Sequence, residues 1–300
     1  MTDQPLFNST ASIDDGRVLI LGSQGKLSLA LQRTLADGPT LRVCGSMDFD
    51  ANIPETALPL IADFQPDTVI NAVAQAGIAQ AIDDPERAYR LNAEFPKFLA
   101  RLSVKHGFVL VHFSSNSVFG RPRATPFGER DAPTPMHVYG FSKHLGDTHV
   151  AALAARHYLV RVPILFGPAR RADQFVEKML HRIATGERKL RIATDVVSSP
   201  SFSNDVAEKI VRIIAQRMPY GLYHVTNQGE ASLFDLMGAI VARAFPEVEV
   251  EPAEHAEFPH RGGVDLYAPL VSEKLPPMRH WREAVNDYTS NLDMAFARGN

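Results

Sequence analysis

Short apolar runs alternate with amphipathic segments over the first 165 residues, and this alternation restricts the chain to few folds. Apolar runs that end in glycine or polar residues are typical of buried strands, and apolar residues at helical spacing are typical of helices. Strands are predicted over 17–22, 41–45, 68–72, 108–113 and 158–162, and helices over 26–36, 54–64, 85–105 and 136–156. Strands that alternate with helices form a parallel sheet covered on both faces. We therefore predict the α/β class with a doubly wound, Rossmann-type sheet, which binds ligands beyond the carboxyl ends of its strands.

The alternation weakens after Gly167, where further helices are predicted near 173–185, 204–216, 232–245 and 281–297. A length of 300 residues allows roughly two domains. We expect a smaller C-terminal substrate-binding domain that is interleaved with the last strands of the sheet. The expected parts are an N-terminal extension over 1–16, a dinucleotide-binding domain over 17–165 that is completed by roughly 190–222, and a substrate-binding domain over 166–189 and 223–300.

Composition excludes several classes of partner. The 31 basic residues do not outnumber the 34 acidic ones, so we expect no nucleic acid partner. No stretch approaches the roughly 18 uninterrupted apolar residues of a membrane span. Cys44 is the only cysteine, which excludes an internal disulfide and suits a cytoplasmic location. The histidines lack the spacing of a zinc site, so we predict no metal. A small-molecule substrate is the expected partner, and a homodimer is compatible with the sequence.

A glycine turn joins the first predicted strand to the first predicted helix. In the segment Gly22–Ser28, glycine recurs after two residues, and a small serine follows after two more. Glycine lets the backbone approach a pyrophosphate, and the free N–H groups at the start of a helix stabilise its charge. The spacing differs from the G-x-G-x-x-G fingerprint, so an ordinary strand-to-helix turn is the alternative. We interpret the turn as a dinucleotide site.

The residues after the second predicted strand bear on the choice of cofactor. An acidic residue there would bind the ribose 2′-hydroxyl of NADH, but the chain has Cys44-Gly45-Ser46. Lys26 and Arg42 lie nearby in the sequence and could attract a 2′-phosphate. NADP(H) is therefore favoured over NAD(H), with solvated basic side chains as the alternative interpretation.

Tyr139 and Lys143 are four residues apart in a predicted helix, which places both on one face. An ammonium group near a phenol stabilises the phenolate and lowers the phenol's pKa. Such a phenol can give a proton to a carbonyl oxygen while hydride reaches the carbon. The serine cluster within 114–117 follows the fourth predicted strand, where a hydroxyl could polarise the same carbonyl. Together with the glycine turn, these residues predict a carbonyl reductase.

These segments together resemble the extended short-chain dehydrogenase/reductase superfamily and, within it, the dTDP-4-dehydrorhamnose reductase family. The resemblance runs from about residue 17 to residue 292. It implies reduction by NAD(P)H of a 4-keto group on a nucleotide-linked 6-deoxysugar. The segments that carry it include Gly22–Ser28, Asp48-Phe49, Asn71–Ala74, Ser114–Phe119, which is similar to Ser-Thr-Asp-Tyr-Val-Phe of the family, and Tyr139-Gly140 with Lys143.

The resemblance also assigns roles to individual residues. Ser115 would polarise the carbonyl, Tyr139 would donate the proton, and Lys143 would lower the pKa of the phenol and hold the nicotinamide ribose. The residues expected to contact the cofactor are Gly22, Gln24, Gly25, Lys26, Leu27, Asp48, Phe49, Ala72, Val73, Ala74, Gln75, Asn92, Phe113, Tyr139 and Lys143. Those expected to contact the substrate are Ser115, Asn116 and Ile164.

Four departures from the family pattern lie near the expected sugar pocket. Asn116-Ser117 replaces Asp-Tyr, Ile164 stands where Trp is common, Arg261-Gly262-Gly263 replaces Arg-Pro, and Ala79 stands where Asp is usual. The sequence therefore supports the fold and the Tyr–Lys pair more strongly than the identity of the sugar. Two alternatives stay open: an epimerase or dehydratase that retains its NAD(P), and a non-catalytic regulatory subunit of the methionine adenosyltransferase type.

Overall fold

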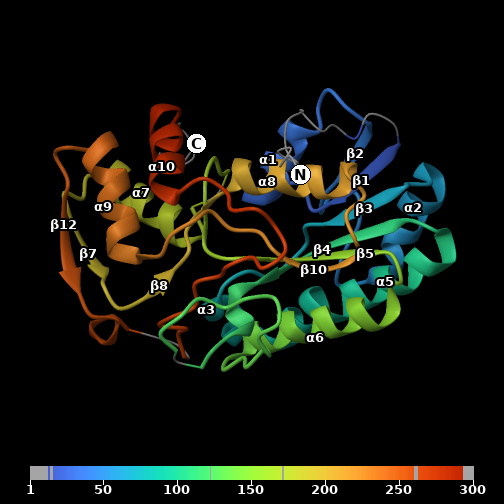
Figure 1. Cartoon of the computed structure of the whole chain (residues 1–300), viewed down its shortest axis with the longest axis horizontal. Coiled ribbons are helices and arrows are strands. Elements are labelled where there is room, and N and C mark those ends of the chain that lie inside the picture. The colour runs from blue at the N-terminus through green and yellow to red at the C-terminus, as the bar shows by residue number, and fades with distance from the viewer. Residues whose placement is uncertain (1–12, 14–15, 122, 171, 260–262, 293–300) are drawn as a thin grey trace, which may run out of the picture.

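A six-stranded sheet forms the centre of the computed structural model, with the strand order β10-β5-β4-β3-β1-β2 (Figure 1). The structure describes residues 13, 16–121, 123–170, 172–259 and 263–292. The strands are β1 (Arg17–Leu21), β2 (Thr40–Cys44), β3 (Thr68–Asn71), β4 (Val109–Ser115), β5 (His157–Val162) and β10 (Gly221–His224). Every pairing in this sheet is parallel, which confirms the predicted doubly wound α/β fold.

Helices cover both faces of the sheet because alternate strand residues point to opposite sides. Val18 and Ile20 pack with α1 (Lys26–Thr34) and α8 (Ser203–Ala215). Leu19 and Leu21 pack on the other face. The helices of that face are α2 (Leu58–Phe64), α5 (Phe95–His106) and α6 (Val138–Leu153). Figure 1 shows α1 and α8 above the sheet and α5 and α6 below it.

The single helix predicted over 85–105 is divided into three parts. It consists of α4 (Pro85–Tyr89), a π-helical turn (Arg90–Glu94) and α5. Pro96 has no N–H to donate to the carbonyl of Asn92, so the regular hydrogen-bond pattern cannot pass this point. A further short helix, α3 (Ile78–Asp83), precedes these and was not predicted. Asn92, one of the residues expected to contact the cofactor, lies in this irregular turn.

A smaller unit is built mainly from the later part of the chain and has its own buried core around Trp281. Its helices are α7 (Phe175–Ala184), α9 (Leu233–Ala244) and α10 (Trp281–Ser290), and its paired strands are β7 (Lys189–Ala193) with β12 (Glu249–Ala253) and β8 (Val197–Ser198) with β11 (Ala231–Ser232). Strands β6 (Leu165–Phe166) and β9 (Ser201–Phe202) pair where the chain passes between the units.

The two units are interleaved along the chain. The segment 190–222 was expected to complete the dinucleotide-binding domain. Within it, α8 packs on the large sheet and β10 begins, whereas β7 pairs with β12 in the smaller unit. None of the helices in the described ranges is long and apolar enough to cross a membrane.

Candidate active site

The predicted catalytic side chains come together where β4 ends and α6 begins. Ser115 is the last residue of β4, and Tyr139 and Lys143 lie one turn apart near the start of α6. The close approach of α6 requires Gly140, because a Cβ atom there would lie 2.2 Å from the carbonyl oxygen of Ser117. The helix begins at this point because His137 caps it, with its Nδ1 accepting a hydrogen bond of 3.0 Å from the N–H of Gly140.

The Ser115 hydroxyl is held by its neighbours. It accepts a hydrogen bond of 3.1 Å from the N–H of Ser117 and lies 3.2 Å from Oδ1 of Asn116, to which it can donate. The Ser115 side chain lowers the pKa of the Tyr139 phenol, so the two hydroxyl groups lie close to each other.

The electrostatics of Tyr139 differ from the sequence-based expectation. Burial raises the pKa of the phenol, the negative charges of Asp147 and Asp265 raise it further, and the hydrogen bond from Ser115 lowers it. Lys143 does not act on the phenol: its ammonium donates to the carbonyl oxygen of Phe113 at 2.5 Å. Burial lowers the pKa of Lys143 to about 8, against a smaller raising effect of Asp147. The phenol is therefore a protonated group at neutral pH.

The glycine turn after β1 packs closely against the end of β3 at Gly22 and leaves open space at Gly25. Gly22 has a φ of 98°, and a Cβ atom there would lie 2.9 Å from the carbonyl carbon of Ala72. Gly25 precedes α1 and has nothing within 4 Å of the position a Cβ atom would take. No side chain caps the first amides of α1. The first amides of α1 therefore face open space at Gly25, which is the arrangement by which helix N-termini bind anions.

The two basic side chains that favoured NADPH in the sequence both have acidic partners. Lys26 is buried, with its Nζ 2.7 Å from Oε1 of Glu177 and 2.7 Å from the carbonyl oxygen of Leu165. Arg42 pairs with Asp63 at 2.7 Å. The side chain of Lys26 thus turns away from the cofactor turn toward the smaller unit, so the argument for NADPH from its charge is wrong. Only the backbone of Lys26 remains a candidate for cofactor contact.

Two of the residues predicted to contact the cofactor have side chains that contact other residues of the protein. Asn92, in the π-helical turn, accepts from the N–H of Gln75 and donates to the carbonyl of Gln75 and to the hydroxyl of Ser142, each at 3.0 Å. It therefore fastens the loop after β3 to α6. Phe49 is buried and stacks on Phe95, with 5.8 Å between the ring centroids.

The remaining predicted cofactor residues lie along the carboxyl edge of the sheet. Asp48 accepts a hydrogen bond of 2.7 Å from the N–H of Gly45, directly after β2. Residues 72–75 follow β3, and Phe113 lies in β4. Gln24 and Leu27 flank the start of α1, where Arg170 donates to Oε1 of Gln24 at 3.2 Å.

Residues on the predicted substrate side connect the two units. The amide of Asn116 donates to the carbonyl of Ala268 at 2.9 Å and to the hydroxyl of Ser198 at 3.3 Å. Ile164 is half-buried, and its carbonyl accepts from the N–H of Ser201 at 3.0 Å. The substitution at 261–262 lies outside the described residues.

A buried pair that the sequence did not indicate lies beside Tyr139. Nε2 of His137 is 3.0 Å from Oδ2 of Asp265, and both side chains are more than nine-tenths buried. The rings of His137 and Tyr139 are nearly parallel, at 11°, with 6.3 Å between their centroids. Histidine is not among the preferred capping residues and Asp265 is 128 residues away, so no local pattern could have revealed the pair.

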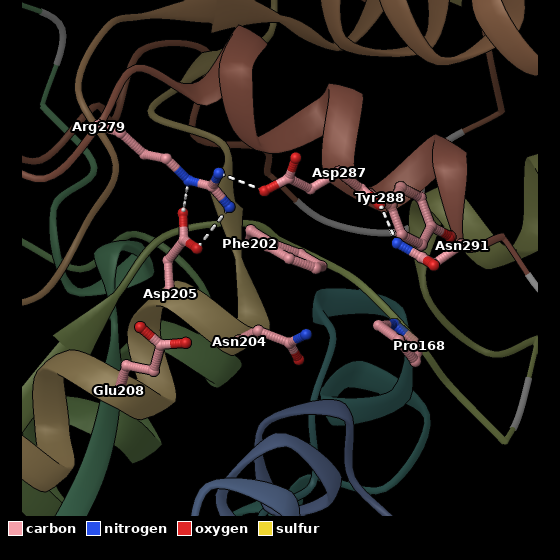
Figure 2. A pocket seen from close by; sticks show the side chains of 9 residues that line it. All are labelled: Pro168, Phe202, Asn204, Asp205, Glu208, Arg279, Asp287, Tyr288 and Asn291. Carbon is pink, nitrogen blue, oxygen red and sulfur yellow. Dashed lines mark hydrogen bonds and ion pairs between the residues drawn. The ribbon is translucent and has the colours of Figure 1, made fainter. Parts of the chain in front are cut away.

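Two cavities lie apart from these residues. Figure 2 shows one of about 320 Å³ between the start of α8 and the end of α10, where Arg279 binds both carboxylate oxygens of Asp205 at 2.8 and 2.7 Å and also pairs with Asp287. A second cavity, of about 350 Å³, is lined by Leu270 and Pro277 among others. No predicted site residue lines either cavity, so we do not assign the active site to them.

Comparison with known proteins places the chain in a family. The dTDP-4-dehydrorhamnose reductase of Mycolicibacterium smegmatis is 30% identical over 90% of this chain and 84% of its own length. The structure of a dTDP-4-dehydrorhamnose reductase from Clostridium acetobutylicum matches with a TM-score of 0.86 and 26% identity, covering 92% of this chain and 99% of that one. The structure of dTDP-4-dehydrorhamnose reductase from Bacillus anthracis in complex with NADP matches with a TM-score of 0.85 and 25% identity, covering 91% and 98%. The family model described as the RmlD substrate binding domain matches residues 16–294. This match spans nearly the whole chain, and the protein therefore belongs to the RmlD substrate binding domain family.

Proposed function

We propose that the protein reduces the 4-keto group of a dTDP-linked 6-deoxysugar with NADPH. The observation that carries this proposal is the meeting of the Ser115 hydroxyl, the Tyr139 phenol and the Lys143 ammonium at the carboxyl edge of the sheet. The named reductases among the relatives support the substrate class. The single cysteine, buried and free, fits a reducing compartment, and we place the reaction in the cytoplasm.

The residues present fit a dinucleotide. Gly22 allows the turn to pack on the end of β3, and the open space at Gly25 leaves the first amides of α1 accessible to a diphosphate. NADPH is favoured because the Bacillus anthracis relative was solved with NADP. When bound, NADPH supplies the hydride that the carbonyl carbon gains.

The residues of the chain supply the proton and the polarisation. Tyr139 gives its phenolic proton to the carbonyl oxygen, and its raised pKa keeps that proton in place at neutral pH until it is needed. Ser115 donates to the same oxygen and stabilises the charge that develops on it. Lys143 would hold the nicotinamide ribose from its place beside Tyr139, where its ammonium also donates to the carbonyl oxygen of Phe113.

The test is the loss of NADPH absorbance with dTDP-4-keto-6-deoxysugars as substrates. Tyr139→Phe removes the proton donor and keeps the ring, so we expect turnover to fall by roughly 10²- to 10⁴-fold. Tyr89→Phe, in the partly exposed helix α4, is the matched control and should leave turnover unchanged. Turnover of Tyr139→Phe at the wild-type rate would refute the assigned role.

A further inference from the structure

In the buried pair of His137 and Asp265, one carboxylate oxygen has no hydrogen-bond partner among the described residues. Nδ1 of His137 accepts the N–H of Gly140, so the ring proton of the neutral imidazole is on Nε2 and is donated to Oδ2 of Asp265. The other oxygen, Oδ1, is buried and has no hydrogen-bond partner among the described residues. A buried carboxylate held by one neutral donor is incompletely stabilised and calls for a second donor.

The surroundings of Asp265 indicate which group could donate the second hydrogen bond to this oxygen. Asp265 lies on a segment that is held to β8 by the N–H of Val197 donating to the carbonyl of Leu266 at 2.7 Å. Its charge acts on the phenol of Tyr139, and the ring of its partner His137 stacks beside that phenol. The carboxylate therefore lies close to the proton donor of the proposed reaction.

We propose that Asp265 is a specificity-determining residue whose Oδ1 accepts a hydrogen bond from a hydroxyl next to the reacting carbonyl, while His137 holds the carboxylate in place. This inference rests on the proposed function, because the carbonyl at Tyr139 fixes which hydroxyl is near. In a 4-keto-6-deoxysugar, one neighbour of C4 is C3, which carries a hydroxyl, and the other is C5, which carries the methyl group and the ring oxygen. The recognised group is therefore the 3-hydroxyl.

A purely structural role for the pair makes a different prediction. If His137 and Asp265 only connected α6 to the smaller unit, their replacement would lower the affinity for all ligands by the same factor. If Asp265 instead recognises a hydroxyl, its replacement should lower the affinity only for ligands that have this hydroxyl. A pair of ligands that differ in this one group therefore separates the two roles.

The experiment measures equilibrium binding of dTDP-rhamnose and of its 3-deoxy analogue by calorimetric titration, in the presence of NADP. A hydrogen bond to a charged acceptor changes affinity by roughly 10- to 100-fold, so the wild type should prefer the hydroxylated ligand by about that factor. Asp265→Asn keeps the shape and an acceptor for His137 but removes the charge, and its preference should fall toward unity. Its affinity for the 3-deoxy analogue should stay within about threefold of the wild type.

A second pair of variants tests the part played by His137. Asparagine is a good capping residue, so His137→Asn keeps the cap on α6 but leaves Asp265 without its donor. We expect this variant to lose part of the preference, whereas His137→Ala should lose stability as well. Thermal unfolding and NADP affinity of each variant show that the fold and the cofactor site are intact.

The outcomes are distinct. The inference would be overturned if the wild type bound both ligands with equal affinity or bound neither. It would also be overturned if Asp265→Asn kept the preference for the hydroxylated ligand or lost the same factor of affinity for both ligands. Preference in the wild type that Asp265→Asn abolishes would support it, even if NADPH is not consumed. Absence of NADPH oxidation with any 4-keto-6-deoxysugar would instead count against the proposed function.

Discussion

The buried ion pair between Lys26 and Glu177 gives a sharp test of how the two units are joined. The side chains are 5% and 1% exposed, and Nζ lies 2.7 Å from Oε1. Apart from the Lys26 ammonium, the carboxylate oxygens of Glu177 have no hydrogen-bond donor among the described residues. At 2.7 Å and an effective dielectric constant of about 20, the Coulomb attraction is about 6 kcal/mol, which is a ceiling because both groups lose hydration.

Replacing one partner should destabilise the protein far more than replacing both. Lys26→Met leaves a buried carboxylate without a cation, and we expect it to lower the free energy of unfolding by roughly 3–5 kcal/mol. Glu177→Met leaves the ammonium with the carbonyl of Leu165 and should also be destabilising. The double variant replaces the pair by apolar side chains of similar length and should lie close to the wild type.

The assay is urea unfolding followed by the fluorescence of Trp281, the only tryptophan of the chain. Trp281 is 1% exposed in the core of the smaller unit, which also contains α7 and therefore Glu177. Because the double variant lies close to the wild type, the coupling should equal the summed losses of the two single variants and reach at least roughly 3 kcal/mol. Additive effects of the two single variants, with no coupling, would refute the reasoning that the pair acts as a unit.

Three further predictions concern single positions. Gly146→Ala places a Cβ atom 2.1 Å from the carbonyl oxygen of Asn92 and should lower the free energy of unfolding by about 1–3 kcal/mol, whereas Gly238→Ala, which meets nothing within 4 Å, should be neutral or stabilising in the same urea assay. Burial lowers the pKa of Lys143 to about 8, whereas an unfolded lysine has a pKa of about 10.4, so the unfolded chain holds more protons between these values. Stability should rise with pH across this window by up to about 3 kcal/mol, and the rise should vanish in Lys143→Met. Gly25→Ala has an unstrained φ of −70° but fills the open space before α1, so NADPH affinity measured by titration should fall at least roughly tenfold with unchanged thermal stability.

The fold could be predicted because it follows from local periodicity. The strands of the large sheet and most of its helices are confirmed within a few residues, since a parallel sheet buries continuous apolar runs. The division of the helix near Asn92 was not predicted, although Pro96 signals it once the missing N–H is considered. The pairing of β7 with β12 joins segments far apart in the chain, for which local patterns carry no information.

The candidate site could be predicted only in part. The spacing of Tyr139 and Lys143 indicated that they share a helix face, and the structure places both at the end of β4. The direction of the pKa shift of Tyr139 was not predictable, because it depends on burial and on Asp265 from a distant segment. Likewise, Lys26 was expected near the cofactor, whereas its side chain turns toward Glu177.

The contacts that escaped prediction share a common character. Asn116 reaches the carbonyl of Ala268, His137 reaches Asp265, and Lys26 reaches Glu177, and each is a polar link from the dinucleotide-binding part to the later part of the chain. Apolar packing alone tolerates small displacements, whereas a buried hydrogen bond or ion pair requires its partner at one distance and angle. The parallel sheet therefore sets where α6 lies, and these directional links set how the smaller unit is oriented toward it. This division explains why a sequence can indicate the chemistry of the reacting carbonyl and still leave the identity of the sugar open, since the sugar side of the site is assembled by contacts between distant segments.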